Sequence, residues 1–331
     1  MNNQLFVSGS PHVHSNESVK KIMWAVVIAL LPALCVSVYY FGLPAILVTA
    51  VSIFSCLLFE FLIQKFFFKG KNTLGNGSAV ITGLLLAFNL PSNLPFPWVV
   101  AGAFVAIVIG KLAFGGLGSN PFNPALVGRV FLLISRPVEM TSWPVPKPIW
   151  SFGIDAVTGP TPLGILKEGS MNGESIEQIM EGMPNYVQML FGQMGGSFGE
   201  ISFIALLVGA LFLIFRKVIT WHIPVSFILS AFLLSGLLYL CNPAYYANPF
   251  FHIITGGLML GACFMATDMV TSPSSPWGMI VFGTGCGILT IVIRIFGAYP
   301  EGVSFAILLM NACTPLINKA FKPKRFGGKV A

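Results

Sequence analysis

The chain has 331 residues, of which 55% are hydrophobic and only 9% are charged, and its mean hydropathy is +0.84. Soluble domains carry about a quarter charged residues, so this composition excludes an ordinary soluble domain of this length. The net charge of +7 does not indicate nucleic-acid binding, because the basic residues lie at the ends of apolar segments rather than along one face.

The apolar segments predict an all-α polytopic membrane protein, since a helix needs about 20 apolar residues to cross a bilayer. After a polar arm (1–21), the first group of segments covers 22–41, 45–63, 78–90, 98–114 and 124–135. A long polar region, 136–199, holds more than half of the acidic residues. The second group covers 201–215, 221–240, 250–267, 277–296 and 303–317, and a basic tail (319–331) follows. We therefore expect about ten transmembrane helices.

The distribution of Lys and Arg predicts the orientation in a bacterial inner membrane. When these segments are threaded from a cytoplasmic N-terminus, only Arg136, Lys147, Lys167 and Arg294 of the 18 Lys and Arg fall on or near the outer side. By the positive-inside rule, both termini are cytoplasmic and the 136–199 loop is outside.

The segments also predict an internal repeat. ITGLLLAF (81–88) is similar to ITGGLMLGA (254–262), AIVIGK (106–111) to TIVIRI (290–295), and NPALVGR (123–129) corresponds to NACTPLI (311–317). Each pair is separated by an odd number of spans, so the two five-helix halves, 22–135 and 200–318, would be inverted relative to each other. Inverted repeats with broken helices build binding sites near the bilayer midplane.

Polar residues in the interrupted segments are candidates for lining that site. They include Thr82, Asn120 and Asn123, together with Thr255, Thr267 and Asp268. Neutral donors and acceptors suit a polar ring system or a partly dehydrated cation, although such residues also commonly pack helices together.

Four ionisable residues lie at membrane depth: Glu60, Lys111, Asp268 and Arg294. Lys111 and Arg294 are near segment ends and are expected to reach the interface, and Glu60 is close to Lys65. Asp268 ends a broken helix without an obvious basic partner, so it is the candidate for a cation or proton contact on an ion pathway. The six cysteines have no metal-site or iron–sulfur spacing, and we interpret them as packing residues.

The outer loop contains DAVTGPTPLG (155–164), a hydroxyl-bearing turn with Asp155, Thr158, Gly159 and Thr161. A β-turn alone would explain this stretch, and its chemistry does not choose between the two threonines. The segment nevertheless resembles the flavin-attachment motif shared by the D subunit of the Rnf complex and the B subunit of the sodium-pumping NADH:quinone reductase. The resemblance places covalent FMN, through a phosphodiester, on Thr161, with Asp155, Thr158 and Gly159 as recognition positions. Pro160 stands where family members usually have Ala.

The resemblance extends over nearly the whole chain. SPHVHSNESVKKIMWAVVIALLPA, GGLGSNPFNPALVGRVFLLIS, FMATDMVTSP and YPEGVSFAILLMNACTPLIN are similar to family blocks and occur in the same order. The short arm before the first span favours the Rnf type over the quinone reductase type. One departure is Asn318, where relatives often have Asp.

The resemblance implies a membrane subunit of an ion-translocating ferredoxin:NAD oxidoreductase that is not catalytic alone. It would carry covalent FMN and a noncovalent riboflavin and couple electron transfer to Na⁺ or H⁺ transport. Its implied partners are the other membrane, flavin and iron–sulfur subunits, ferredoxin and NAD indirectly, and a flavin transferase for maturation. The alternatives are the quinone reductase subunit and a non-redox small-solute channel, because a similar fold supports both.

Overall fold

The computed structural model describes residues 17–68, 74–146 and 158–322. These residues are mostly helical, and six helices are long and apolar enough to cross a membrane. They are Val19–Phe41, Leu43–Phe68, Phe96–Phe114, His222–Cys241, Pro276–Phe296 and Val303–Ala320. Three shorter apolar helices accompany them: Ser78–Phe88, Pro124–Ser135 and Phe203–Phe215. The prediction of a polytopic membrane protein is therefore confirmed.

The first half of the chain begins with α1 (Val19–Phe41), capped by the Ser18 hydroxyl, which accepts a hydrogen bond from the Lys21 N–H. Gly42, with φ of +61°, turns the chain sharply into the next helix. A residue with a side chain would adopt this positive φ only under backbone strain. The elements that follow are α2 (Leu43–Ile63), η1 (Gln64–Phe68), η2 (Leu74–Asn76), α3 (Ser78–Phe88), α4 (Phe96–Phe104), η3 (Val105–Ile109), η4 (Leu112–Phe114) and α5 (Pro124–Ser135).

The predicted loop is a small folded unit. It contains α6 (Pro137–Thr141), β1 (Trp143–Pro144), β2 (Thr158–Gly159), α7 (Pro162–Met171), α8 (Ile176–Glu181) and α9 (Tyr186–Phe191). The two strands pair antiparallel, with Trp143 opposite Gly159, so the all-α prediction missed one short hairpin. A separate apolar cluster, including Leu163, Ile179 and Met189, holds the loop helices against Phe251.

The second half contains α10 (Phe203–Phe215), α11 (His222–Cys241), α12 (Pro249–Ile254), α13 (Leu258–Leu260), η5 (Gly261–Met265), α14 (Pro276–Phe296) and α15 (Val303–Ala320). The segment predicted as one span at 250–267 is broken between α12 and α13. Gly256 and Gly257 at the break have φ of +62° and +58°, a conformation that glycine adopts without steric cost.

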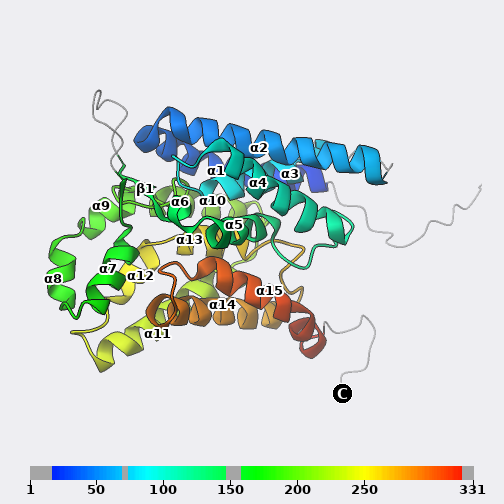
Figure 1. Cartoon of the computed structure of the whole chain (residues 1–331). Helices are drawn as coiled ribbons and strands as arrows, with labels where there is room; N and C mark the ends of the chain where they lie inside the picture. Colours follow the sequence, from blue (N-terminus) through cyan, green and yellow to red (C-terminus); the bar gives the residue numbers. More distant parts are fainter. Residues whose placement is uncertain (1–16, 69–73, 147–157, 323–331) are drawn as a thin grey trace, which may run out of the picture.

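The two halves pack together through their interior helices. Helix α1 lies against α10, and α5 contacts α15, while α2 packs on α3 and α4 and α11 packs on α14 (Figure 1). Gly209 of α10 allows the closest approach, because a Cβ there would lie 2.1 Å from the backbone oxygen of Ala29. Small residues commonly permit such contacts between membrane helices.

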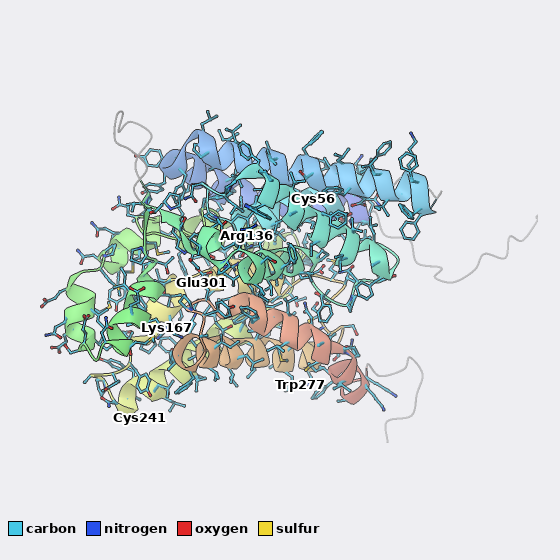
Figure 2. The ribbon with its side chains drawn as sticks, in the orientation of Figure 1. Cys56, Arg136, Lys167, Cys241, Trp277 and Glu301 are labelled. Carbon is cyan, nitrogen blue, oxygen red and sulfur yellow. The ribbon has the colours of Figure 1, made fainter. Side chains whose placement is uncertain are left out.

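Loop helices α7, α8 and α9 gather at one end of the helix bundle, at the left of Figure 1, and α2 and α15 finish at the other. We call these the loop end and the terminal end. Large apolar side chains cover the outer faces of the bundle, among them Phe54, Leu237 and Trp277, the last labelled in Figure 2. Cys56, Cys263 and Cys286 are buried, whereas Cys35, Cys241 and Cys313 lie on exposed helix faces.

Candidate functional site

A cavity near the terminal end brings together five of the polar residues singled out from the sequence. The residues that line it are Thr82, Asn120, Asn123, Thr267 and Asp268, which come from different parts of the chain. The space measures about 780 Å³ with its open mouth included. Apolar side chains from α1, α3, α10 and η5 form the other walls: Ile22, Met23, Val26, Ile81, Leu85, Leu213 and Phe264.

Asn123 connects the cavity to the two halves of the fold. It caps α5, its Oδ1 accepting hydrogen bonds from the N–H groups of Ala125 (3.1 Å) and Leu126 (3.4 Å). Its Nδ2 donates to the backbone oxygen of Met265 at 3.1 Å. Because Met265 ends the interrupted segment of the second half, the side chain of Asn123 joins that segment to α5.

The other four residues form local hydrogen bonds, and Thr267 donates to the backbone oxygen of Cys263 at 2.7 Å. Thr82 donates to the backbone oxygen of Ser78 (3.0 Å) and Asn120 donates to that of Phe122 (3.0 Å). Asp268 accepts a hydrogen bond from the Thr271 hydroxyl at 3.3 Å. The cavity wall therefore offers amide, hydroxyl and carboxylate groups whose orientation is fixed by the fold.

A buried ion pair adjoins this cavity. The Lys111 ammonium lies 2.7 Å from Oε2 of Glu60 and donates to the Ser78 hydroxyl at 2.8 Å, and both charged residues are at most 2% exposed. Lys111 itself lines the cavity, as Asp268 does. The expectation that Lys111 would reach the interface is therefore wrong: Lys111 turns inward because Glu60 supplies a compensating charge.

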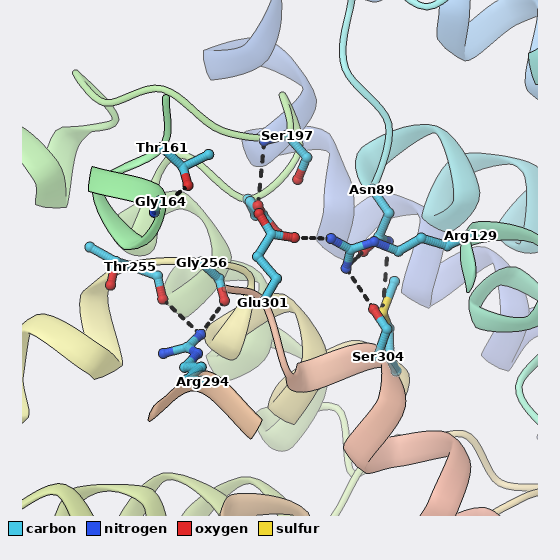
Figure 3. A network of polar contacts seen from close by, with 12 residues as sticks. Asn89, Arg129, Thr161, Gly164, Ser197, Thr255, Gly256, Arg294, Glu301 and Ser304 are labelled. Carbon is cyan, nitrogen blue, oxygen red and sulfur yellow. Dashed lines mark hydrogen bonds and ion pairs between the residues drawn. The ribbon is translucent and has the colours of Figure 1, made fainter. Parts of the chain in front are cut away.

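A second group of charges joins α5 to the segment before α15. Arg129 of α5 forms an ion pair with Glu301 and donates to Oδ1 of Asn89 (2.8 Å) and the hydroxyl of Ser304 (2.7 Å), as Figure 3 shows. Glu200 is buried beside the helix break, and its Oε2 has no hydrogen-bond partner among the described residues. Arg129, which the threading of the segments places on the cytoplasmic side, is buried in this network.

Arg294 of α14 holds the broken helix in place. Its guanidinium donates to the backbone oxygens of Thr255 (3.1 Å) and Gly256, as Figure 3 shows. It also donates to the backbone oxygen of His252 at 2.5 Å. These carbonyls lie at the interruption, where regular helical hydrogen bonds end, and an unsatisfied carbonyl in a membrane interior is costly. Arg294 is 5% exposed, so the expectation that it would reach the interface is also wrong.

The motif in the loop lies at the start of α7. Thr161 is the N-cap: its hydroxyl accepts a hydrogen bond from the Gly164 N–H at 3.0 Å (Figure 3). Thr161 is buried, whereas Thr158 is exposed in β2 next to Gly159. Asp155 lies outside the described residues.

Hollows flank this segment on two sides. One, of about 1020 Å³ with its open space included, is lined by Tyr40, Val145, Pro160, Gln193 and other residues. A smaller one, of about 230 Å³, is lined by Thr161 together with Glu200 and Glu301 of the charge network. Thr161 and these two carboxylates therefore line the same hollow.

The start of α7 has one feature of an anion site, while the carboxylates of Glu200 and Glu301, which line the same small hollow as Thr161, oppose negative charge there. The N-terminal N–H groups of a helix and its dipole stabilise negative charge. A phosphate on the Thr161 hydroxyl would lie at this position. Exposure to solvent alone would instead favour Thr158 as the residue that is modified.

Comparison with known proteins decides the family. Residues 6–327 match the model of the NQR2, RnfD, RnfE family. The chain belongs to this family. The resemblance read from the sequence blocks is confirmed.

Relatives match the chain from end to end. It is 45% identical to the D subunit of the proton-translocating ferredoxin:NAD(+) oxidoreductase complex of Clostridium ljungdahlii, over 97% of this chain and 96% of the relative. It is 44% identical to the D subunit of the Na(+)-translocating ferredoxin:NAD(+) oxidoreductase complex of Acetobacterium woodii, over 98% and 95%. It is 39% identical to the D subunit of the ion-translocating oxidoreductase complex of Stutzerimonas stutzeri, over 94% and 92%.

Sequence reasoning missed three members of the charge network: Arg129, Glu200 and Glu301. Each is an ionisable residue in or beside an apolar run, and this sequence feature could have identified them as candidates. Their mutual contacts were not readable, because Arg129 and Glu301 come from opposite halves of the chain.

Proposed function

We propose that this chain is the D subunit of an Rnf-type complex, which moves electrons between ferredoxin and NAD and transports an ion across the bacterial inner membrane. The observation that carries the proposal is its end-to-end likeness to the D subunits of such complexes, at 44% and 45% identity. A subunit of this kind works only with its partner subunits, which hold the iron–sulfur centres and the NAD-reactive flavin.

Two other functions remain as alternatives. The B subunit of a quinone reductase would belong to the same family, but the relatives named above are ferredoxin:NAD(+) or ion-translocating oxidoreductase subunits. A non-redox channel would need a continuous polar route through the two halves and would carry no flavin.

We infer that the fold comprises ten membrane segments in two inverted halves, 22–135 and 200–318. The packing supports this plan: α1 and α10, the first helices of the halves, lie against each other, and α2–α4 contacts correspond to α11–α14 contacts. The broken segment formed by α12, α13 and η5 completes the ten. The arm (1–21) and tail (319–331) would lie in the cytoplasm and the 136–199 loop outside, so that the loop end faces outward.

Thr161 is the proposed attachment site of FMN. Its hydroxyl is at the start of α7, where the N-terminal N–H groups of the helix favour the phosphate. Thr161 lines the smaller hollow, and its neighbours Pro160 and Pro162 line the larger one. The transferase would need an activated FMN donor, in which the FMN phosphate is joined to a nucleotide by a phosphoanhydride: the P–O–P bond breaks, the nucleotide leaves, and the hydroxyl proton passes to a base. The resulting phosphoester oxygen has no proton but can still accept from the Gly164 N–H. Before attachment, the flavin transferase would recognise the motif through Asp155, Thr158 and Gly159.

The cavity near the terminal end is the proposed riboflavin site. A ring system with carbonyl and N–H edges needs the mixture of amides, hydroxyls and apolar walls that this cavity offers through Asn120, Asn123 and Thr82. Bound flavins supply one- and two-electron redox chemistry, and the protein positions and tunes them. The side chains named here would orient the ring, exclude water and set its hydrogen bonds.

Asp268 is the proposed contact of the coupling ion. It lies in the same cavity, so an ion or proton bound there would be close to the ring and respond to its charge. This proximity gives a physical reason for electron transfer to change ion affinity in that cavity.

Purification of the tagged chain from its native membrane tests the proposal. We expect copurification with iron–sulfur and NAD-reactive flavin subunits, fluorescence of the denatured chain in a gel from covalent FMN, and riboflavin in the acid-soluble fraction. Copurification with a quinone-reducing assembly would favour the first alternative, and a chain without partners or flavin would favour the channel.

A further inference from the structure

A second pocket, at the loop end, is not part of any of the proposed flavin or ion sites. It measures about 830 Å³ with its open space included and lies between α7, the segment before α12 and the end of α14. Its walls include Lys167, Arg294 and His252, the tyrosines Tyr245 and Tyr246, and the apolar residues Leu163, Leu166, Met171 and Phe296.

The charges of this pocket are of one sign. Lys167 and Arg294 are cationic, and no Asp or Glu is among the described residues that line it. Arg294 is 5% exposed and the Nδ1 of the buried His252 has no hydrogen-bond partner within the part of the chain that the structure describes. Glu200 and Glu301 act electrostatically on Arg294, whereas no carboxylate among the described residues does so on Lys167, so Lys167 is the cation that lacks a compensating charge.

Lys167 is placed to hold an anion. Its ammonium donates to the backbone oxygens of Arg294 (3.3 Å) and Gly297, so two of its three protons have acceptors and one remains. Partial burial lowers the pKa of Lys167, and a bound anion would offset that effect.

The mouth of the pocket opens onto a surface suited to lipid. Tyr245 and Phe296, which line the pocket, are each more than 60% exposed. Leu240, near the end of α11, is exposed to a similar degree. Tyrosine rings favour the membrane–water interface, and apolar helix faces below them suit acyl chains. The combination of a cationic base, an interfacial aromatic rim and an apolar flank matches an amphiphile with an anionic headgroup.

We propose that this pocket binds one anionic phospholipid, whose phosphate contacts Lys167 and whose acyl chains lie along the exposed faces of α11 and α14. The site is separate from Thr161, because Lys167 and Ser170 lie farther along α7 than its N-cap. It requires only that the chain be embedded in a membrane, so its failure would leave the proposed function untouched.

Native mass spectrometry of the intact purified complex tests the site, with added phosphatidylglycerol or phosphatidylcholine. We expect wild type to retain one phosphatidylglycerol in preference to phosphatidylcholine. Lys167→Gln should lower retention about fivefold, since one basic residue near a membrane contributes about 1 kcal/mol toward anionic lipid. Ser170→Phe should block the pocket without changing any charge, and Lys319→Gln, which removes an exposed lysine at the terminal end, should have no effect.

Two arms of the experiment separate the possible sources of the anion. Inorganic phosphate should not displace the lipid, because the apolar flank contributes to binding. Equal retention of both lipids, unchanged retention in both pocket variants, displacement by phosphate alone, or a flavin in place of the lipid would each overturn the proposal.

Discussion

Arg294→Leu is the substitution that should most directly disturb the broken helix. The guanidinium donates to three backbone oxygens at the interruption. Each buried carbonyl left without a donor costs about 1–3 kcal/mol, so the loss amounts to about 3–9 kcal/mol. The upper part of that range is comparable to the whole stability of an ordinary domain.

The assay is the melting temperature of the purified protein in detergent, together with the protease sensitivity of residues 249–265. At about 2 °C per kcal/mol, Arg294→Leu should lower the melting temperature by about 6–18 °C. Arg294→Lys keeps the charge but has a shorter, compact donor group, so it should fall between wild type and Leu. Arg216→Leu, at the exposed end of α10, is the matched control. A melting temperature within about 2 °C of wild type for Arg294→Leu would refute the reasoning about the carbonyls.

Three further outcomes are expected. Lys111→Met should destabilise the protein by about 3–5 kcal/mol by leaving Glu60 buried without the ammonium, and adding Glu60→Gln should recover most of the loss in a thermal melt; no recovery would show that the pair is not the cause. Asp268→Asn should weaken ion-stimulated turnover while the FMN stays bound, and loss of riboflavin in a flavin assay would instead make Asp268 a flavin ligand. A reporter fused after Lys329 should be active only in the cytoplasm and one within 169–184 only outside, and swapped results would reverse the orientation.

The sequence predicted the positions of the membrane helices well, because hydrophobic length and Pro or Gly at segment ends are local signals. The predicted 124–135 segment coincides with α5, and Ser18, Asn123 and Ser275 cap their helices as such residues commonly do. The sequence also identified Thr82, Asn120, Asn123 and Asp268 as candidate site residues, and all four line one cavity.

The partners of the buried charges were not predictable in the same way. Lys111 and Glu60 are far apart in sequence, and local patterns assign each a separate role although their charged atoms lie 2.7 Å apart. Arg294 has the sequence context of a residue near a helix end, yet its partners are carbonyls from another segment. Contacts of this kind depend on how the two halves pack, which no local pattern records.

The hairpin before α7 was missed for a related reason. Its strands have two residues each, too short for an alternating pattern to be visible. The role of Thr161 as an N-cap was nevertheless available from the sequence, since Thr followed by Pro commonly starts a helix.

The most direct test of the account is where the covalent flavin lies. Thr161→Asn is the most informative variant. Asn is a good N-cap, so the start of α7 is kept, but it has no hydroxyl that could form a phosphoester. Its matched control is Thr158→Val. Peptide mass spectrometry of wild type coexpressed with the flavin transferase should find an FMN-sized addition on the fragment containing Thr161. In-gel fluorescence should disappear in Thr161→Asn and persist in Thr158→Val, with riboflavin retained in both. Fluorescence that survives in Thr161→Asn, or an addition mapped to Thr158, would contradict the account.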